Sequence, residues 1–473
     1  METMAENKER FNSGRDFKFG LATAGFQIEG GYNGPGEPAN NWIEWETLGK
    51  VDPSGIAIDF WNNYEQILDL TKATGVTYFR LSIEWTRCWP KPSELDQQAV
   101  DRYENILKAI LKRGLTPIIT LVHFTTPHYY GSNPWLDQGF IDHFVEWTKF
   151  AVLRFKSYCN NWVTINEPII YSSMSYFTGM LPPGEIGKIR HVTSSYQNQL
   201  LGHIKAYEAI KDIQPNSTVS FNNFCFSVYE LDKAITDIML AKSRYIKQEN
   251  LVEYLQSQKK EYYLEIGPAS KRDSLFRSSL AKLLNPTTVF KKLIDAVYSS
   301  AFESTIDVIQ LDFYNPITSS HFRMPGHKTS GGRNWAPGRM LWDDTIDPDL
   351  FYKYLKANSD DKVPLWILES GLCNRVKNGR SFKRNDGWDR PRFLNSYFTA
   401  LKKAVENNLN IEAYFYWTVA DNYEWGSYEP RFGIFGVDRE RGNKILMQDS
   451  MGYDSATKLK SLIDDFRQVY SKT

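Results

Sequence analysis

Short β-rich runs that alternate with longer helical patterns constrain the fold of this chain more than any other feature. Several of the runs are apolar on both faces, as strands of a parallel sheet are when helices cover them. Eight runs stand out: Phe19–Ala24, Val76–Ile83, Thr116–Leu121, Trp162–Ile165, Thr218–Asn222, Asp307–Leu311, Val363–Leu368 and Ile411–Trp417. They predict an α/β fold, a single (β/α)8 TIM barrel over residues 1–473, although a doubly wound sheet also alternates in this way.

The segments between these runs have the spacing of amphipathic helices. In Val100–Leu111 the apolar residues recur at i, i+3, i+4 and i+7. That stretch ends with Lys112, Arg113 and Gly114, cations in the last turn followed by a residue suited to a left-handed stop. Tyr64–Thr74 and Phe393–Val405 show the same pattern. These stretches are predicted to be helices that cover the barrel.

Two spans are longer than a simple barrel unit requires. Residues 225–305 carry helical patterns, and residues 320–344 are rich in glycine and arginine, which predicts a surface loop. Loops that follow the strands of a barrel gather at its catalytic face. We therefore expect long βα-loop insertions there, in a position to set substrate selectivity.

Charge and apolar patterning exclude several classes of partner. Lys plus Arg and Asp plus Glu both number 56, so the net charge is zero and nucleic-acid binding is not expected. No run of about 18 apolar residues predicts a membrane span. The scattered cysteines are expected to be reduced, which favours a cytoplasmic location; they are Cys88, Cys159, Cys225 and Cys373. The oligomeric state stays open, a homo-oligomer included.

No pattern in the sequence predicts a metal or a cofactor. The 7 histidines form neither a His-x-x-x-His nor a His-Glu-x-x-His cluster, and no Gly-x-Gly-x-x-Gly loop is present. The 14 Trp, 27 Tyr and 28 Phe residues suit either sugar stacking or a large core. Composition alone favours the interpretation that these aromatic residues fill a large core.

Two glutamates occupy unusual positions. Glu167 follows the apolar run Trp162–Ile165 and precedes Pro168, and Glu369 ends the run Val363–Leu368. A carboxylate at the C-terminal end of a barrel strand lies at the mouth where catalysis occurs. Two such groups on opposite sides of a glycosidic bond supply the proton and the electron density that its cleavage needs. By position alone, a structural salt bridge at each strand end is an equally good interpretation.

Two motifs, Thr164–Pro168 and Leu368–Gly371, contain the two glutamates. Further motifs are spread along the chain: Phe17–Ala24, Gln27–Gly30, Arg80–Arg87, Leu121–Phe124, Tyr414–Trp417, Asp421–Trp425 and Arg431–Gly433. In their order along the chain, these segments resemble the motifs of family-1 glycoside hydrolases, the β-glucosidase family. Thr164–Pro168 resembles the acid/base motif of this family, and Leu368–Gly371 resembles its nucleophile motif.

The resemblance implies a retaining mechanism with Glu167 as acid/base and Glu369 as nucleophile. It places Arg80 beside Glu369, where the cation would keep the carboxylate ionised, and Tyr314 in a hydrogen bond to it. Glu167, near the charge of Glu369, is expected to have a raised pKa. Trp417 would form the floor on which the sugar stacks. Hydroxyl-binding roles are implied for Gln27, His123, Asn166, Glu424 and Trp425.

Two departures from the family pattern concern the nucleophile's surroundings. Asp312 stands where the family usually has Asn, and Ser370 replaces the usual Asn after the nucleophile. Asp312 would bring a third carboxyl close to Glu369 and change the pH profile, because nearby like charges disfavour joint ionisation.

The resemblance favours unphosphorylated substrates. Members that act on 6-phosphorylated sugars carry Ser in place of Glu424 and a Lys where this chain has Pro430. The expected substrate is a small carbohydrate or an aryl or alkyl glycoside, a β-glucoside or β-galactoside. A transglycosylase of the same fold and a catalytically silent sugar-binding relative are the alternatives.

Overall fold

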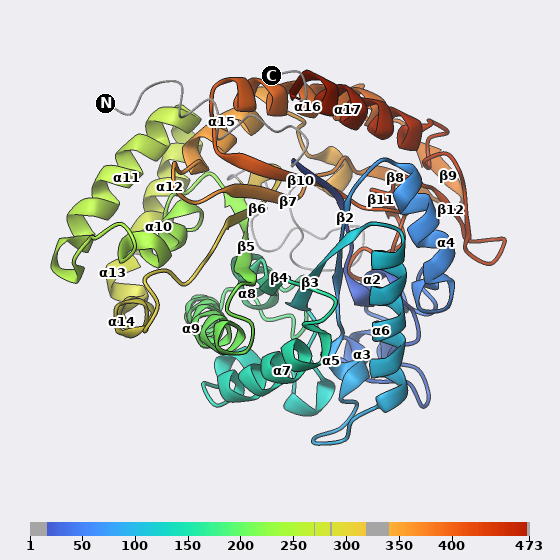
Figure 1. Ribbon diagram of the computed structural model, residues 1–473, viewed down its shortest axis with the longest axis horizontal. Helices are drawn as coiled ribbons and strands as arrows, with labels where there is room; N and C mark the ends of the chain where they lie inside the picture. Colours follow the sequence, from blue (N-terminus) through green and yellow to red (C-terminus); the bar gives the residue numbers. More distant parts are fainter. Residues whose placement is uncertain (1–16, 269, 284–285, 318–339, 471–473) are drawn as a thin grey trace.

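The computed structural model describes residues 17–268, 270–283, 286–317 and 340–470. Parallel strands close into a barrel, ringed by helices, in the order β1-β2-β3-β4-β5-β6-β7-β10 (Figure 1). Their bounds are Lys18–Ala22, Tyr78–Ser82, Thr116–Val122, Asn161–Asn166, Thr218–Phe226, Ile309–Ile317, Leu365–Glu369 and Ile411–Trp417. Each overlaps one of the predicted runs, so the barrel prediction is confirmed.

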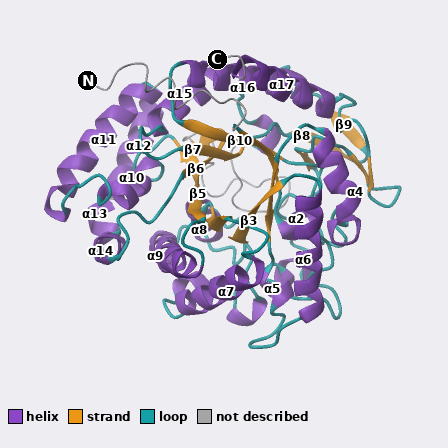
Figure 2. Ribbon diagram, in the orientation of Figure 1, coloured by secondary structure: helices purple, strands orange, loops and turns teal. Residues whose placement is uncertain are grey.

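Helices surround the barrel (Figure 2). Those before the long insertion are α2 (Gly25–Ile28), α3 (Ile43–Thr47), α4 (Phe60–Ala73), α5 (Trp85–Cys88), α6 (Gln97–Lys112), α7 (Phe140–Phe155), α8 (Pro168–Tyr176) and α9 (Ile189–Ile213). After it come α15 (Pro348–Asn358), α16 (Arg390–Glu406) and α17 (Ser455–Tyr470). Short 3-10 turns lie at His128–Tyr130, Pro134–Leu136, Gln248–Asn250 and Leu341–Asp343.

The three helices predicted from periodicity are confirmed as α4, α6 and α16. Helix α6 begins where the Asp96 side chain accepts a hydrogen bond from the Ala99 amide (2.9 Å), and its apolar face is buried. Beyond its C-terminal end, Gly114 has φ +63°. Gly75 follows α4 in the same conformation, with φ +83°. Glycine adopts this left-handed stop without steric cost.

The interior of the barrel changes from apolar to polar along the strands. Alternate residues such as Ile118, Val163 and Phe415 form a packed cluster separate from the larger one beneath the helices. Further along the strands, the same alternation presents Arg80 and Asn222, both fully buried. Polar side chains thus replace the apolar filling towards the C-terminal ends of the strands, where the catalytic face of such a barrel lies.

The insertion at 225–305 is helical, as predicted. It carries α10 (Lys233–Ala241), α11 (Leu251–Ile266), α12 (Lys271–Leu283), α13 (Pro286–Val289) and α14 (Lys291–Ser299). Of the loop predicted at 320–344, residues 320–339 lie outside the described part. Within the described ranges, no helix has both the length and the apolarity that a bilayer crossing demands.

Two small antiparallel sheets were absent from the prediction. One is ordered β11-β8-β9 and the other pairs β12 with β13. Their strands are β8 (Asn374–Lys377), β9 (Arg380–Phe382), β11 (Pro430–Arg431), β12 (Val437–Asp438) and β13 (Lys444–Ile445). Runs of two to four residues are too short to show alternation in a sequence.

Candidate active site

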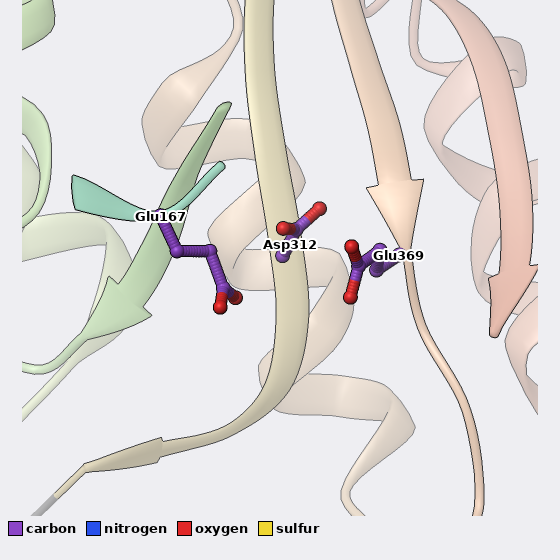
Figure 3. A group of neighbouring side chains, drawn as sticks. All are labelled: Glu167, Asp312 and Glu369. Carbon is purple, nitrogen blue, oxygen red and sulfur yellow. The ribbon is translucent and has the colours of Figure 1, made fainter. Parts of the chain in front are cut away.

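Three buried carboxyl groups meet at the C-terminal end of the barrel (Figure 3). Glu167 follows β4, Asp312 lies in β6 and Glu369 ends β7. A carboxylate oxygen of each lies within 4.8 Å of one from each of the others. This spacing fits the roughly 5–5.5 Å between the carboxyl groups of a retaining glycosidase better than the roughly 6.5–9.5 Å of an inverting one.

Local backbone geometry aims Glu167 at the other carboxyl groups. Its φ of 36° and ψ of 61° are left-handed, a conformation that is costly for a residue with a side chain. Pro168 starts α8 and disfavours the right-handed helical region for the residue before it. The Glu167 amide donates to the Asn222 carbonyl across to β5 (3.0 Å), which holds the turn in place.

Arg80 ties the polar groups of this region together. Its guanidinium donates to Glu369 Oε1 (2.5 Å), Asn166 Oδ1 (2.5 Å) and Thr120 Oγ1 (3.0 Å). The Tyr314 hydroxyl donates to the other oxygen of Glu369, Oε2 (3.1 Å). The structure therefore places Arg80 and Tyr314 beside Glu369, as the sequence predicted.

Burial dominates the electrostatics of the site. It raises the pKa of Glu167 well above its ordinary value, and the neighbouring charge of Glu369 raises it further. The pKa of Glu369 is also raised, because burial outweighs the lowering effect of Arg80. The expectation that Arg80 would set this pKa was therefore incomplete. For His123, burial and Arg80 both lower the pKa well below its usual range, so the imidazole is neutral.

A second group of predicted site residues surrounds Glu424. Gln27 Nε2 donates to Glu424 Oε2 and Trp417 Nε1 donates to Glu424 Oε1, both over 3.0 Å. Burial raises the pKa of Glu424 to about 8, although these two hydrogen bonds act to lower it. The three side chains form one rigid polar unit, because each of the two carboxylate oxygens is held by a donor from a different element.

Aromatic rings enclose the site. The Trp425 ring lies 4.9 Å from Phe124, 5.7 Å from His123 and 5.7 Å from Trp42, measured between ring centroids. The Trp417 ring lies 5.8 Å from His123. His123, Trp417 and Trp425 are thus brought together from the segment just after β3, the end of β10 and the loop that follows β10.

Several buried polar atoms at this place have no hydrogen-bond partner among the described residues. They are Gln27 Oε1, His123 Nδ1, Asn166 Nδ2, Glu167 Oε1 and Asp312 Oδ1. Buried polar atoms are nearly always hydrogen-bonded in folded proteins. Such a concentration of free acceptors and donors beside aromatic rings suits a ligand with many hydroxyl groups.

Asn222 is a site residue that was not predicted from the sequence. Its Nδ2 donates to Asn166 Oδ1 (2.9 Å) and to Asp312 Oδ2, and its Oδ1 accepts from Arg80 (3.3 Å). The available signal was a polar amide at the end of the predicted strand Thr218–Asn222. That signal identifies an inward polar position without revealing its partners.

The closed barrel and its facing carboxyl pair define a glycosidase of the retaining class. The model of the family "Glycosyl hydrolase family 1" matches residues 8–462. The chain therefore belongs to glycosyl hydrolase family 1 and is a β-glycosidase.

Individual relatives agree on the family and differ in substrate. The chain is 26% identical to a beta-glucosidase A of Acetivibrio thermocellus, over 94% of this chain and 98% of the relative. It is 25% identical to a 6-phospho-beta-galactosidase of Lacticaseibacillus casei, over 95% and 99%. A family 1 β-glucosidase structure from Thermotoga maritima superimposes with a TM-score of 0.72 at 22% identity, covering 95% of this chain and 98% of that one.

Proposed function

We propose that the protein hydrolyses unphosphorylated β-D-glycosides by double displacement and releases the terminal non-reducing glucosyl or galactosyl residue. Glu167 is the acid/base and Glu369 the nucleophile. The observation that carries the proposal is the close approach of these two carboxyl groups, one with a raised pKa and the other hydrogen-bonded by Arg80 and Tyr314.

The reaction needs two steps. In the first, a Glu369 oxygen bonds to the anomeric carbon while Glu167 gives its proton to the departing glycosidic oxygen. In the second, Glu167 takes a proton from water, and the resulting hydroxide oxygen displaces Glu369 from the sugar. Arg80 and Tyr314 each donate to one oxygen of Glu369, so they orient it for attack and stabilise its charge when it leaves.

The sugar is held by polar atoms that have no hydrogen-bond partner among the described residues. A sugar hydroxyl can donate to Gln27 Oε1, accept from Asn166 Nδ2, and do either with His123 Nδ1. Glu424 and Trp425 bind further hydroxyls, and the Trp417 ring provides the floor on which the apolar face of the sugar stacks.

The preference for unphosphorylated sugars rests on Glu424. Identity to the relatives does not decide this point, because the β-glucosidase and the 6-phospho-β-galactosidase match almost equally well. The side chains that donate to Glu424 are Gln27 and Trp417, and neither carries a positive charge. A phosphate brought to this carboxyl group would lose its hydration without gaining a cation in return.

We also propose a cytoplasmic location, which the cysteines support. All four are unpaired and buried, as expected for a protein of a reducing compartment.

The test is turnover of 4-nitrophenyl β-glycosides that differ in the sugar, together with their 6-phosphorylated counterparts. We expect hydrolysis of the glucoside or galactoside, none of the phosphorylated forms, and loss of activity in Glu369→Ala. Hydrolysis of the phosphorylated forms alone would overturn the substrate assignment. Transfer to an added alcohol in preference to water would identify a transglycosylase, and binding without turnover a silent relative.

A further inference from the structure

Asp312 lies between the two catalytic carboxyl groups in the view of Figure 3, and none of its surface is exposed. Its Oδ2 accepts a hydrogen bond from Asn222 Nδ2. The orientation of the Asn222 amide is fixed independently, because its Oδ1 accepts from Arg80. The amide nitrogen must therefore face Asp312, so Oδ2 is the accepting oxygen of that carboxyl group.

The remaining oxygen of Asp312, Oδ1, has no amide, hydroxyl or cationic donor among the described residues, and neither has Glu167 Oε1. One oxygen of each of these two carboxyl groups nevertheless lies within 4.8 Å of one of the other. Two carboxylates cannot form a hydrogen bond, since an ionised carboxyl group only accepts. A proton on one of the pair would give both free oxygens a partner, and on Asp312 the oxygen left to carry it is Oδ1.

The charges around Asp312 also favour a proton on its carboxyl group. The groups that face it are Arg80 on β2, Glu167 after β4, Cys225 on β5, Tyr314 on β6 and Glu369 on β7. Arg80 supplies the positive charge among them, and it is already bonded to Glu369. Three ionised carboxyl groups would leave two uncompensated charges in a buried site. Burial and the neighbouring carboxylates accordingly raise the pKa of Asp312 well above its usual range.

We propose that Asp312 is a positioning residue that is protonated at the pH of turnover and donates a hydrogen bond to Glu167. The inference rests on the proposed roles of Glu167 and Glu369. When Glu167 gives its proton to the leaving oxygen, its new carboxylate accepts a stronger hydrogen bond from Asp312, and the two groups share the one proton that is left. Water then returns a proton to Glu167 in the second step.

A shared proton also changes the response to pH. As the pH rises, the pair loses one proton and keeps the second, which Glu167 and Asp312 share. A fraction of the enzyme therefore keeps Glu167 protonated where an isolated acid would be ionised. The fall in rate on the alkaline side is spread over two steps and reaches higher pH.

The test compares the pH dependence of kcat/KM in wild type and Asp312→Asn. The amide still donates to Glu167 but holds no titrating proton, so activity at the optimum stays within a few-fold of wild type. The alkaline limb moves to lower pH by about one unit or more. The acid limb does not move, because Asp312 is uncharged there in both proteins.

Asp232→Asn is the matched control. Asp232 is also fully buried, with a pKa raised to about 8, and its Oδ2 accepts from the Tyr262 hydroxyl and the Phe226 amide. The carboxyl becomes an amide in both variants, but Asp232 is not among the groups that shift the pKa of Glu167 or Glu369. We expect the wild-type pH profile in this variant.

Three results would overturn the inference. A superimposable profile in Asp312→Asn means that the proton is not shared. Movement of both limbs means that Asp312 acts as a permanent negative charge. A profile that changes on addition of EDTA assigns the carboxyl cluster to a cation instead.

A second measurement does not depend on turnover. The ¹³C NMR signal of the Asp312 carboxyl, identified by its loss in Asp312→Asn, should have the shift of a protonated acid at neutral pH. An ionised carboxylate there overturns the inference even if activity is found. If no glycoside is hydrolysed, the proposed function fails, while this signal still decides the protonation state of Asp312.

Discussion

Two buried clusters of this protein share the same ingredients and differ in one respect. At the barrel mouth, Glu167, Asp312 and Glu369 surround Arg80. Near the start of the chain, Glu29 and Glu84 lie close to Arg87. Burial raises the pKa of the carboxyl groups in both clusters, to about 7 for Glu84.

The difference lies in hydrogen bonding. Glu29 accepts from Tyr32, Arg87 and Tyr103, and Glu84 accepts from Ser82 (2.8 Å) and Thr125 (2.6 Å). At the mouth, by contrast, Glu167 Oε1 and Asp312 Oδ1 have no hydrogen-bond partner among the described residues. Burial and a raised pKa therefore do not by themselves distinguish a catalytic cluster from a structural one. Between these two clusters the difference is the unsatisfied oxygens at the mouth, which a ligand would complete.

The largest difference in kcat is expected between the variants Glu369→Gln and Glu84→Gln. Loss of the proposed nucleophile should lower kcat by at least about 10⁴-fold, because no other group would form the bond to the sugar. The same substitution at Glu84 should leave kcat within an order of magnitude, since that side chain only supports the fold. Steady-state kinetics on an aryl glycoside measures both. Equal losses in the two variants would remove the distinction between the clusters.

Glu167→Gln should lower kcat by roughly 10²–10⁴-fold on alkyl glycosides, which need a proton on the leaving oxygen. The loss in the first step should be smaller for nitrophenyl glycosides, whose leaving group needs little protonation. Glu29→Gln should show no such dependence on the leaving group. An equal loss with both kinds of substrate would contradict the assignment of Glu167 as the acid.

The cluster of Glu29, Glu84 and Arg87 should affect the stability of the fold and not the rate of the reaction. Because the pKa of Glu84 is about 7 in the folded protein against an ordinary 4.5, folding retains a proton that the unfolded chain releases in this range. The free energy of unfolding should therefore fall as pH rises from about 4.5 to 7, by up to about 3 kcal/mol. Chemical denaturation should show a flatter dependence in Glu84→Gln, and the wild-type dependence in Glu44→Gln at an exposed position.

The smallest effect is expected at a single unsatisfied atom. His123→Phe removes the free Nδ1 while keeping a ring of similar size against Trp425. We expect kcat/KM to fall by roughly ten- to hundredfold, which corresponds to the cost of one lost hydrogen bond. The free energy of unfolding should not decrease. A variant that is less stable but equally active would show that His123 belongs to the core and not to the ligand site.

The barrel and its catalytic end followed from the sequence because both depend on local patterns. Strands buried on two faces are apolar throughout, and residues at the end of such a strand must lie at the mouth. Glu167 and Glu369 were located in this way, and the family resemblance supplied the roles proposed for them. The strands β8 and β9 were missed, since they are too short to carry a pattern and exist only through pairing.

What the sequence by itself determined is the fold, the family and most of the polar residues that reach the barrel mouth, Asn222 excepted. Only the tertiary structure decided how they pair: that Asn222 joins Arg80 to Asp312, and that burial outweighs Arg80 in raising the pKa of Glu369. The physical reason is that hydrogen bonding and desolvation depend on distances between strands far apart in the chain, and no local pattern encodes those distances.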